Sequence, residues 1–304
     1  MSDTFDERRV RYLYEAVTYG SIRAAADKLD MNPSVISRQV AQLEAELAIP
    51  LLERHGRGVK PTEAGRLLVE YYRQYRSHQE DLISKVGEIR GLARGHVDLI
   101  SGEGFVADLM GEPLELFWKR YPGVTIAVRV SGTNEVVRSV IEDDSQIGLV
   151  YGPPVVPGIR SRVATRQPMC AIVRPDHPLA RAGVEPVLKR LLDYPVALME
   201  GSYGTRQILQ LAEQHEKLRF SPHLTTDSMA VLKHFVRDGH GISILPALAV
   251  TQEIDAGQLC AIPIDNLILH AAEAHLITRL GRQLSPAANQ LATHLIATMR
   301  TFRK

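Results

Sequence analysis

The chain has 304 residues, a formal net charge of +1 and an apolar fraction of 45%. This length exceeds one typical domain of about 100–200 residues, so we expect two or three globular domains with real cores. The net charge favours no class of partner, and residues 1–91 carry equal numbers of acidic and basic side chains. Any nucleic-acid site must therefore be argued from where the charges lie.

Neither export nor a membrane span is predicted. The N-terminal sequence MSDTFDERRV has no apolar run of the signal-peptide kind, and no stretch approaches the roughly 18 consecutive apolar residues of a membrane helix. The two cysteines, Cys170 and Cys260, are too few for a disulfide framework. Both lie in apolar, strand-like runs, so we interpret them as buried inert thiols, with a redox switch as the alternative. We expect a cytoplasmic, bacterial-type protein with no membrane partner.

Residues 6–60 are predicted to form short helices separated by single turns, and three of these helices can be placed. The first carries apolar residues at Val10, Leu13 and Val17 and is expected to end at Gly20. Ser21 is placed to cap a second helix, IRAAADKL, whose alanines allow another helix to cross closely. After a tight turn, Asn32 caps a third helix over 33–47. Two short helices joined by such a turn indicate a helix-turn-helix.

The third helix has two contrasting faces. Apolar residues recur at steps of four, three and four and predict the buried face: Ile36, Val40, Leu43 and Leu47. The opposite side of the first two turns carries Ser34, Ser37 and Arg38. Small side chains let a helix enter the DNA major groove, while Ser and Arg reach phosphates and base edges. These three are our candidate DNA contacts on this helix; the alternative is an ordinary helical hairpin within a core.

The segment ERHGRGVKPT, residues 53–62, predicts a hairpin-like wing. Arg54, Arg57 and Lys60 surround two glycines, and apolar residues flank them. Cations at the tip of a wing beside the two-helix unit suit the phosphate backbone next to the groove. A solvated basic loop is the alternative.

One long helical pattern covers about 62–90, with Thr62 placed as its cap. Leu68, Tyr75, Leu82 and Ile89 recur at intervals of seven, which is typical of a dimerising stripe. The helix therefore predicts a homodimer that presents two recognition helices to a palindromic DNA site. The alternative is a helix that packs on its own chain.

After GLARG (91–95), short β-rich runs alternate with helical stretches. The expected strands are HVDLIS, VTIAVRV, QIGLVYG, MCAIVR, VALME, GISILP and AHLITR, and the clearest helices cover 112–120, 134–142 and 205–215. This alternation predicts a mostly parallel, doubly wound α/β region.

No motif supports catalysis, a cofactor or a metal. GEGFVA (102–107) imitates a dinucleotide fingerprint, but the next strand ends without the acidic residue that holds a ribose. GSYG (201–204) has Glu200 where a nucleophile elbow needs glycine, so it more simply shapes a helix entrance that accepts a polar or anionic group. The eleven histidines show no ligand spacing.

The stretch GSIRAAADKLDMNPSVISRQVAQLEAEL…LLERHGRGVKPTEAG resembles the winged helix-turn-helix of LysR-type transcriptional regulators. Ser37 and Arg38 match that family's Ser-Arg pair, and Arg54 matches the basic residue that opens its wing. The resemblance implies a DNA-binding domain at 1–62, a dimerising linker helix at 63–91 and an effector-binding domain at 92–304. In the last, it implies two doubly wound α/β subdomains similar to a periplasmic binding protein, at about 92–162 plus 268–304 and at about 163–267.

The resemblance also implies a ligand cleft lined by loops at the strand ends. The candidate effector-binding residues on those loops are Glu103, Gly104, Phe105, Thr133, Ser202, Tyr203, Thr205 and Asp227. The family often has Ser or Thr at Gly104, and commonly a ligand-contacting hydroxyl at Thr133. Glu103 could favour a ligand bearing an amine or hydroxyls over a plain carboxylate. Its alternatives are solvent exposure or pairing with an arginine.

We therefore expect a DNA-binding regulator controlled by a small organic effector, active as a homodimer that assembles into a homotetramer, and not an enzyme. Two alternatives remain open. The α/β part could be an enzyme fused to a DNA-binding head, which a turnover assay would reveal. It could also be a purely structural DNA-bridging protein that binds no ligand.

Overall fold

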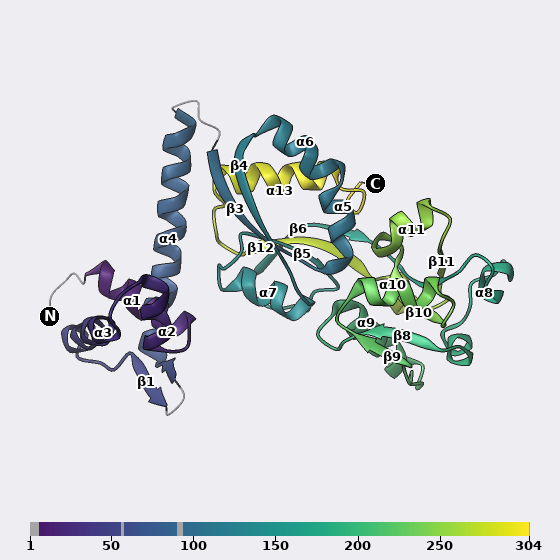
Figure 1. Cartoon of the computed structure of the whole chain (residues 1–304), viewed down its shortest axis with the longest axis horizontal. Coiled ribbons are helices and arrows are strands. Elements are labelled where there is room, and N and C mark those ends of the chain that lie inside the picture. Colours follow the sequence, from purple (N-terminus) through teal and green to yellow (C-terminus); the bar gives the residue numbers. More distant parts are fainter. Residues whose placement is uncertain (1–5, 56–57, 90–93, 304) are drawn as a thin grey trace. The chain divides into compact units, whose positions relative to one another are not determined.

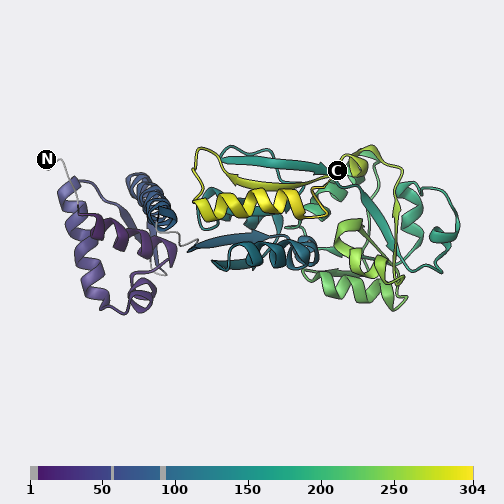
Figure 2. The same ribbon diagram turned by 90° about the horizontal axis from the view of Figure 1, so that it is seen from above.

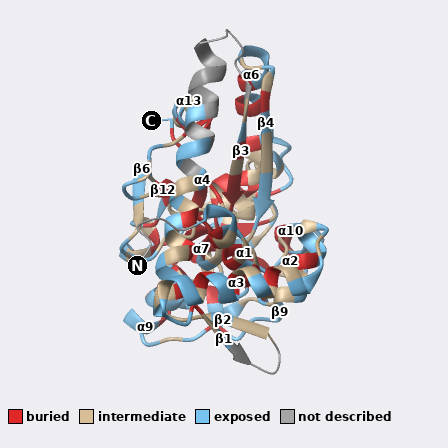
Figure 3. Ribbon diagram, turned by 90° about the vertical axis from the view of Figure 1, so that its left-hand side faces the viewer, coloured by how far each residue is buried: buried red, intermediate tan, exposed pale blue. Residues whose placement is uncertain are grey.

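The computed structural model describes residues 6–55, 58–89 and 94–303, which fall into two compact units, Met1–Ile83 and Ser84–Lys304 (Figure 1). In each unit, the buried residues lie where its helices and strands face one another (Figure 3). No helix among the described residues is long and apolar enough to cross a membrane.

The first unit begins with the three expected helices. Their bounds are α1 Glu7–Thr18, α2 Ile22–Leu29 and α3 Pro33–Leu47. The predicted caps are confirmed: Ser21 Oγ accepts the Ala24 N–H at 3.0 Å, and Asn32 Oδ1 accepts the Ser34 N–H at 2.9 Å. The predicted apolar stripe of α3 is buried at Ile36, Val40 and Leu43 against α1, α2 and α4.

The predicted wing is an antiparallel hairpin of β1 (Leu52–His55) and β2 (Gly58–Pro61). It is fastened to the turn between α1 and α2, because the Val59 N–H donates to Gly20 O at 2.9 Å. A Cβ on Gly58 would lie 2.3 Å from that same oxygen, and its φ is +148°, so only glycine fits here. On the other side, Glu44 Oε1 accepts the N–H groups of Leu51 and Leu52, which ties the wing to α3.

The long helix α4 (Glu63–Ile89) is present, and Thr62 caps it by accepting the Gly65 N–H at 3.0 Å. The predicted seven-residue stripe divides in two. Leu68 and Tyr75 pack against the core of their own unit, as the alternative interpretation held, whereas Leu82 is 62% exposed. The side chain of Ile89 lies outside the described residues.

The second unit contains two five-stranded sheets. The first has the order β4-β3-β5-β12-β6, with bounds β3 Arg94–Ser101, β4 Gly123–Val130, β5 Ile147–Tyr151, β6 Ile159–Arg166 and β12 Glu273–Arg279. The helices beside it are η1 Glu103–Phe105, α5 Val106–Met110, α6 Glu112–Arg120, α7 Thr133–Ile141 and α13 Pro286–Thr298. We call this half subdomain I.

Alternate residues of the first sheet enter separate clusters on its two faces. Leu99 and Leu149 pack with α6 and α13, while Ile100 and Val150 pack with α7. Figure 2 shows α13 running along the sheet. This period-two division is what a sheet covered on both faces requires.

The second sheet has the order β11-β7-β10-β8-β9 and forms subdomain II. Its strands are β7 Met169–Val173, β8 Val196–Met199, β9 Leu224–Thr226, β10 Ile242–Pro246 and β11 Cys260–Pro263. Its helices are α8 Pro178–Arg181, η2 Leu188–Asp193, α9 Gly204–His215, α10 Met229–Arg237, η3 Ala247–Val250, α11 Thr251–Asp255 and α12 Leu267–His270. Leu198 packs on the α9 face and Met199 on the α10 face.

All seven predicted strands are present, but the sheets are mixed rather than mostly parallel. β3, β4 and β5 pair in parallel, as do β8, β9 and β10, whereas β12 is antiparallel to β5 and β6, and β7 to β10 and β11. The two reversed strands, β7 and β12, are the first that the chain forms after each crossing from one sheet to the other. The list of expected strands did not include β6 or β9, which are polar or short, whereas β11 is the apolar, strand-like run noted around Cys260.

Candidate DNA interface and effector cleft

The first candidate site is the exposed face of α3. Ser34 and Arg38 are exposed there, and Ser37 is half-buried. Ser34 Oγ donates to Asn32 Oδ1 at 2.8 Å, so this hydroxyl also fixes the start of the helix. Within the described part of the chain, the Arg38 guanidinium takes part in no hydrogen bond or ion pair, and it therefore faces solvent with all its donors available.

The same face continues for two further turns, which sequence reasoning missed. Ala41, Gln42 and Ala45 are exposed beyond Arg38, with Gln42 one turn after it. Two alanines keep the surface shallow, and a Gln side chain is suited to base edges. The spacing of four from Arg38 was the available signal.

The structure describes only some of the cationic side chains of the wing. Lys60 is exposed on β2 and lies opposite Glu53 on β1. The backbone of Arg54 pairs with that of Val59, but the Arg54 side chain and the whole of Arg57 lie outside the described residues.

The second candidate site is formed by four loops at the carboxyl ends of β3, β4, β8 and β9. Four hydrogen bonds join these loops across the two subdomains. The Gly204 N–H donates to Thr133 Oγ1 at 2.7 Å, and the Met229 N–H donates to Glu103 Oε2 at 2.8 Å. Asn134 provides the other two: its N–H donates to Ser202 O at 3.4 Å, and its Oδ1 accepts from Gln207 Nε2 at 3.0 Å.

Both helices of subdomain II that begin at this cleft are capped by subdomain I. The N-cap residues Tyr203 of α9 and Ser228 of α10 make no side-chain capping bond themselves. Thr133 and Glu103 supply those acceptors instead. The carboxylate of Glu103 therefore lies at the positive end of a helix, where the helix dipole stabilises an anion. Neither solvent exposure nor an arginine partner, the alternatives for Glu103, describes its position.

Between these contacts lies a cavity of about 30 Å³, which we call the inner chamber. Six of the eight predicted effector residues line it: Glu103, Gly104, Phe105, Thr133, Tyr203 and Thr205. Tyr151, Met229 and Leu248, which the sequence did not indicate, complete its walls. Such a volume holds a water molecule or two but no organic ligand.

Ser202 and Asp227 do not line the inner chamber, which corrects their expected placement. Both residues are exposed, and the contacts they make here use main-chain oxygens: Ser202 O accepts from Asn134 N, and Asp227 O accepts from Tyr203 Oη at 2.9 Å. In a tight turn only some side chains point inward, and the sequence does not reveal which.

The two threonines of the chamber differ in their bonding. Thr133 is 5% exposed, and its hydroxyl both accepts from Gly204 N and donates to Tyr151 O at 3.3 Å. Thr205 Oγ1 is buried and has no hydrogen-bond partner among the described residues. A buried hydroxyl without a hydrogen-bond partner is unusual and lowers the stability of the folded protein by about 1–3 kcal/mol.

The charge on the described lining of the inner chamber is negative only. Among the lining residues that the structure describes, Glu103 has the only carboxylate, and none is a lysine, arginine or histidine. Tyr203 lies beside it, and burial, together with the charges of Glu103, Asp227 and Glu200, raises the pKa of its hydroxyl. Burial also raises the pKa of Tyr151, whose hydroxyl donates to Gln167 O at 2.5 Å. Both phenols are therefore neutral donors near pH 7.

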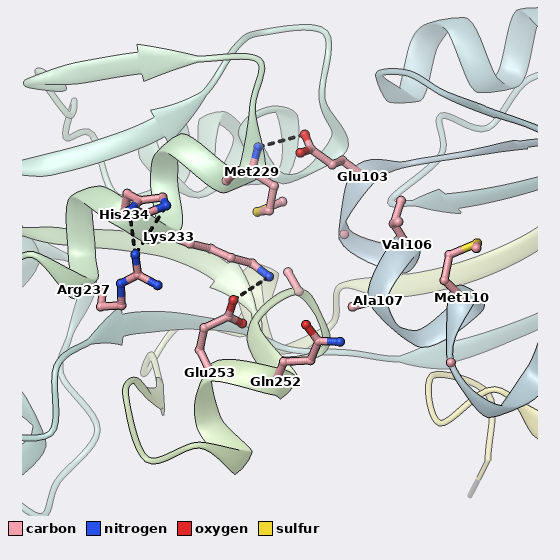
Figure 4. Close-up of a pocket in the computed structure, with 14 residues that line it drawn as sticks. Glu103, Val106, Ala107, Met110, Met229, Lys233, His234, Arg237, Gln252 and Glu253 are labelled. Carbon is pink, nitrogen blue, oxygen red and sulfur yellow. Dashed lines mark hydrogen bonds and ion pairs between the residues drawn. The ribbon is translucent and has the colours of Figure 1, made fainter.

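A larger cavity of about 520 Å³, the outer pocket, opens on the other side of the Glu103–Met229 hydrogen bond (Figure 4). One wall is α10, with Lys233, His234 and Arg237, and α11 contributes Gln252 and Glu253. The facing wall is α5, with Val106, Ala107 and Met110. The two cavities share Glu103, Gly104, Met229 and Ala249 as their common boundary.

The cysteines lie on adjacent strands but on opposite faces of the sheet. Cys170 is buried with the α10 cluster, and Cys260 packs against the cluster on the α9 face. In the β7–β11 register, Cys170 lies opposite Pro263 and Cys260 opposite Val173. Burial raises the pKa of Cys170 to about 11. Within the described residues, no group of three or more His, Cys, Asp or Glu could hold a metal ion.

Comparison with known protein families identifies both units. Residues 8–66 match the family described as "Bacterial regulatory helix-turn-helix protein, lysR family", and residues 90–300 match "LysR substrate binding domain". The transcriptional activator CmpR of Synechocystis sp. (strain PCC 6803) is 26% identical over 281 residues, which cover 91% of this chain and 90% of CmpR.

Two solved structures show the same fold. Full-length CbnR in complex with its target DNA is 19% identical, with a TM-score of 0.58 over 97% of this chain and 100% of CbnR. The regulatory domain of CcmR from Synechocystis PCC6803, in complex with 2-PG, is 21% identical, with a TM-score of 0.59 over 68% of this chain and 98% of that domain. The protein thus belongs to the LysR family of transcriptional regulators, in which DNA binding is controlled by a small-molecule effector.

Proposed function

We propose that the inner chamber is the effector site, and that the effector is a small amine or polyhydroxyl compound. The observation that carries this proposal is the buried hydroxyl of Thr205, which has no partner among the described residues and lines the chamber. An effector that supplies a partner would relieve about 1–3 kcal/mol of unfavourable free energy in the effector-free protein. Glu103, the one charged group of the described lining, favours ligand donors over ligand carboxylates.

Effector binding must enlarge the chamber. At about 30 Å³ it is far below the roughly 300 Å³ at which organic ligand pockets begin, so the subdomains have to separate. The hydrogen bonds that must lengthen are Gly204–Thr133 and Met229–Glu103. The effector thereby exchanges these bonds for its own and shifts the balance between two arrangements of the subdomains. We propose that this shift changes how paired subunits space their DNA-reading helices.

The DNA-reading groups proposed here are Ser34, Ser37, Arg38 and the newly recognised Gln42 on α3. Arg54, Arg57 and Lys60 on the wing are proposed to contact phosphates. The exposed, uncommitted guanidinium of Arg38 supports the first group, and the exposure of Lys60 on the hairpin supports the second. Phosphate contacts position a protein on DNA, and base contacts provide sequence preference.

We propose a homodimer formed through α4, which would bind palindromic half-sites, and a homotetramer formed through a second contact. On α4, Leu67, Tyr71 and Leu82 are 70%, 41% and 62% exposed and lie within about 60° of one another around the helix. This stripe replaces the predicted one. For the second contact, edge strand β4 and α6 expose Val128, Val130 and Trp118. Apolar groups at an unpaired sheet edge favour association.

The proposed organisation retains a DNA-binding domain at 1–62, a linker helix at 63–91 and an effector domain at 92–304. We further propose a cytoplasmic protein that catalyses no reaction, since its relatives are regulators. A turnover assay with any bound metabolite tests this point, and steady product formation would contradict it.

The effector proposal is tested by a thermal-shift screen of the full-length protein against amines, polyols and carboxylates. Hits are then titrated calorimetrically into wild type and Thr205→Val. We expect amine or polyhydroxyl hits whose affinity falls at least tenfold in the variant, because valine keeps the shape but loses the hydroxyl. A screen that yields no amine or polyhydroxyl hit, or equal affinities of such hits in the two proteins, would reject the proposed site and ligand class.

A further inference from the structure

We infer that the outer pocket is a second ligand site, separate from the inner chamber, and that it takes an amphipathic carboxylate. Its volume of about 520 Å³ lies within the range of small-molecule sites, whereas the inner chamber holds a water or two at most. The two walls differ in chemistry: α10 carries basic side chains, and α5 is apolar (Figure 4).

The charges on the basic wall are not equally neutralised. Lys233 Nζ lies 3.0 Å from Glu253 Oε1, and both side chains are more than four-fifths buried, so the charge of Lys233 is neutralised by this pair. The second carboxylate oxygen, Glu253 Oε2, is buried and has no hydrogen-bond partner among the described residues. Arg237 is paired more loosely and is 40% exposed: its Nε lies 3.8 Å from Asp238 Oδ1. Its Nη2 donates to the His234 ring at 2.7 Å, and this ring lies 3.9 Å from the same carboxylate of Asp238. Arg237 is therefore the cation of the pocket that an incoming anion can engage.

The acidic groups of the pocket do not oppose an anion at Arg237. Glu253 is held by Lys233, and Glu103 is turned to the first N–H of α10. Because Met229 and Arg237 are eight residues apart, these two ends of α10 are separated by about 12 Å along the helix axis. A carboxylate beside Arg237 thus forms a charge-assisted hydrogen bond far from Glu103.

The facing wall defines the rest of the ligand. Val106 and Ala107 are half-buried and Met110 is 55% exposed, and the three present an apolar surface from subdomain I to the pocket. A short aliphatic or aromatic body covering this surface would remove apolar area from water. The geometry therefore requires a ligand with one carboxylate and an apolar body, in contrast to the donor-rich effector proposed for the inner chamber.

The test uses the full-length protein and hexanoate as the probe in isothermal titration calorimetry. Hexanamide lacks the charge and acetate lacks the apolar body, so each is expected to bind at least tenfold more weakly than hexanoate. Equal binding of hexanamide and hexanoate would overturn the assignment to a carboxylate, and equal binding of acetate would overturn the role of the apolar wall.

Matched variants locate the probe. Arg237→Gln and Met110→Glu should each weaken hexanoate binding at least tenfold, whereas Arg190→Gln, an exposed arginine of the same subdomain outside the pocket, should leave it unchanged. Thr205→Val should also leave it unchanged, so failure here is distinct from failure at the inner chamber. Unaltered binding in Arg237→Gln, or a changed assembly mass in Met110→Glu, would overturn the inference; the latter would assign the apolar wall to a subunit contact.

Discussion

The carboxylate of Glu103 accepts a hydrogen bond from the Met229 amide at 2.8 Å, and so a side chain of subdomain I caps a helix of subdomain II. The same bond forms the boundary between the inner chamber and the outer pocket. A carboxylate at a helix N-terminus occupies the position that an external anion would otherwise take. Glu103 therefore fastens the cleft, and in the proposed function it excludes anionic ligands from the inner chamber.

Replacing Glu103 with Gln should loosen this fastening without removing the hydrogen-bond acceptor. The charge–dipole part of the capping interaction, typically about 0.3–1 kcal/mol, is lost. We expect faster amide hydrogen exchange at the start of α10 and unchanged exchange in α13, which lies in subdomain I. Identical exchange at Met229 and its neighbours would show that the charge of Glu103 does not hold the cleft.

Replacing each of the two threonines of the inner chamber with valine should have different effects on the free energy of unfolding. In the absence of effector, Thr133→Val leaves the Gly204 N–H without its acceptor and should lower the free energy of unfolding by about 1–3 kcal/mol. Thr205→Val removes a hydroxyl that has no partner among the described residues, so stability should be unchanged or slightly raised. Urea denaturation measures both, and similar losses in the two variants would contradict the bonding described here.

Arg38→Ala should weaken specific DNA binding by about 1–3 kcal/mol, the usual value of a good base contact. Gln42→Ala should act similarly if its amide reads a base edge.

Lys60→Ala should weaken specific and non-specific binding alike and reduce the salt dependence, because a phosphate contact carries no sequence information. Gel-shift titrations at several salt concentrations separate these effects. Lys28→Ala, exposed on α2, is the matched control.

Leu82→Glu should dissociate the proposed α4 dimer, because it places a charge in the exposed apolar stripe of this helix. Size-exclusion chromatography with light scattering gives the mass directly. Gln79→Glu adds the same charge to an exposed position of the same helix outside the stripe and should leave the mass unchanged. A wild-type mass for Leu82→Glu would assign α4 to another role.

Cys170 should be unreactive near neutral pH. Burial raises the pKa of its thiol to about 11, so the nucleophilic thiolate is scarce until the pH approaches that value. The pKa of the Cys170 thiol is higher in the folded than in the unfolded state. The stability that the protonated thiol contributes is therefore complete below about pH 9 and is lost as the pH rises towards 11. Iodoacetamide labelling of the native protein at pH 8 checks the first statement. Rapid modification of Cys170, or a Cys170–Cys260 disulfide after peroxide, would contradict it.

Local sequence signals determined much of this protein. The caps at Ser21, Asn32 and Thr62, the buried stripe of α3 and the seven apolar strands follow from side-chain chemistry and periodicity, which act within a few residues. The ligand cleft was implied by the resemblance to LysR-type regulators, and the α/β pattern placed its candidate residues on loops at the strand ends.

Tertiary structure alone decided the rest. Periodicity places Leu68 and Tyr75 on one stripe with Leu82, but only packing shows that the first two face their own core while Leu82 is exposed. Thr133 and Thr205 each place a hydroxyl at a strand-end loop. The hydroxyl of Thr133 makes two hydrogen bonds, whereas that of Thr205 has no partner among the described residues. That difference depends on Gly204 and Tyr151, whose distance in the sequence from Thr133 is 71 and 18 residues respectively. Hydrogen bonding acts over about 3 Å in space, whatever the separation along the chain, and only the folded arrangement brings such partners together.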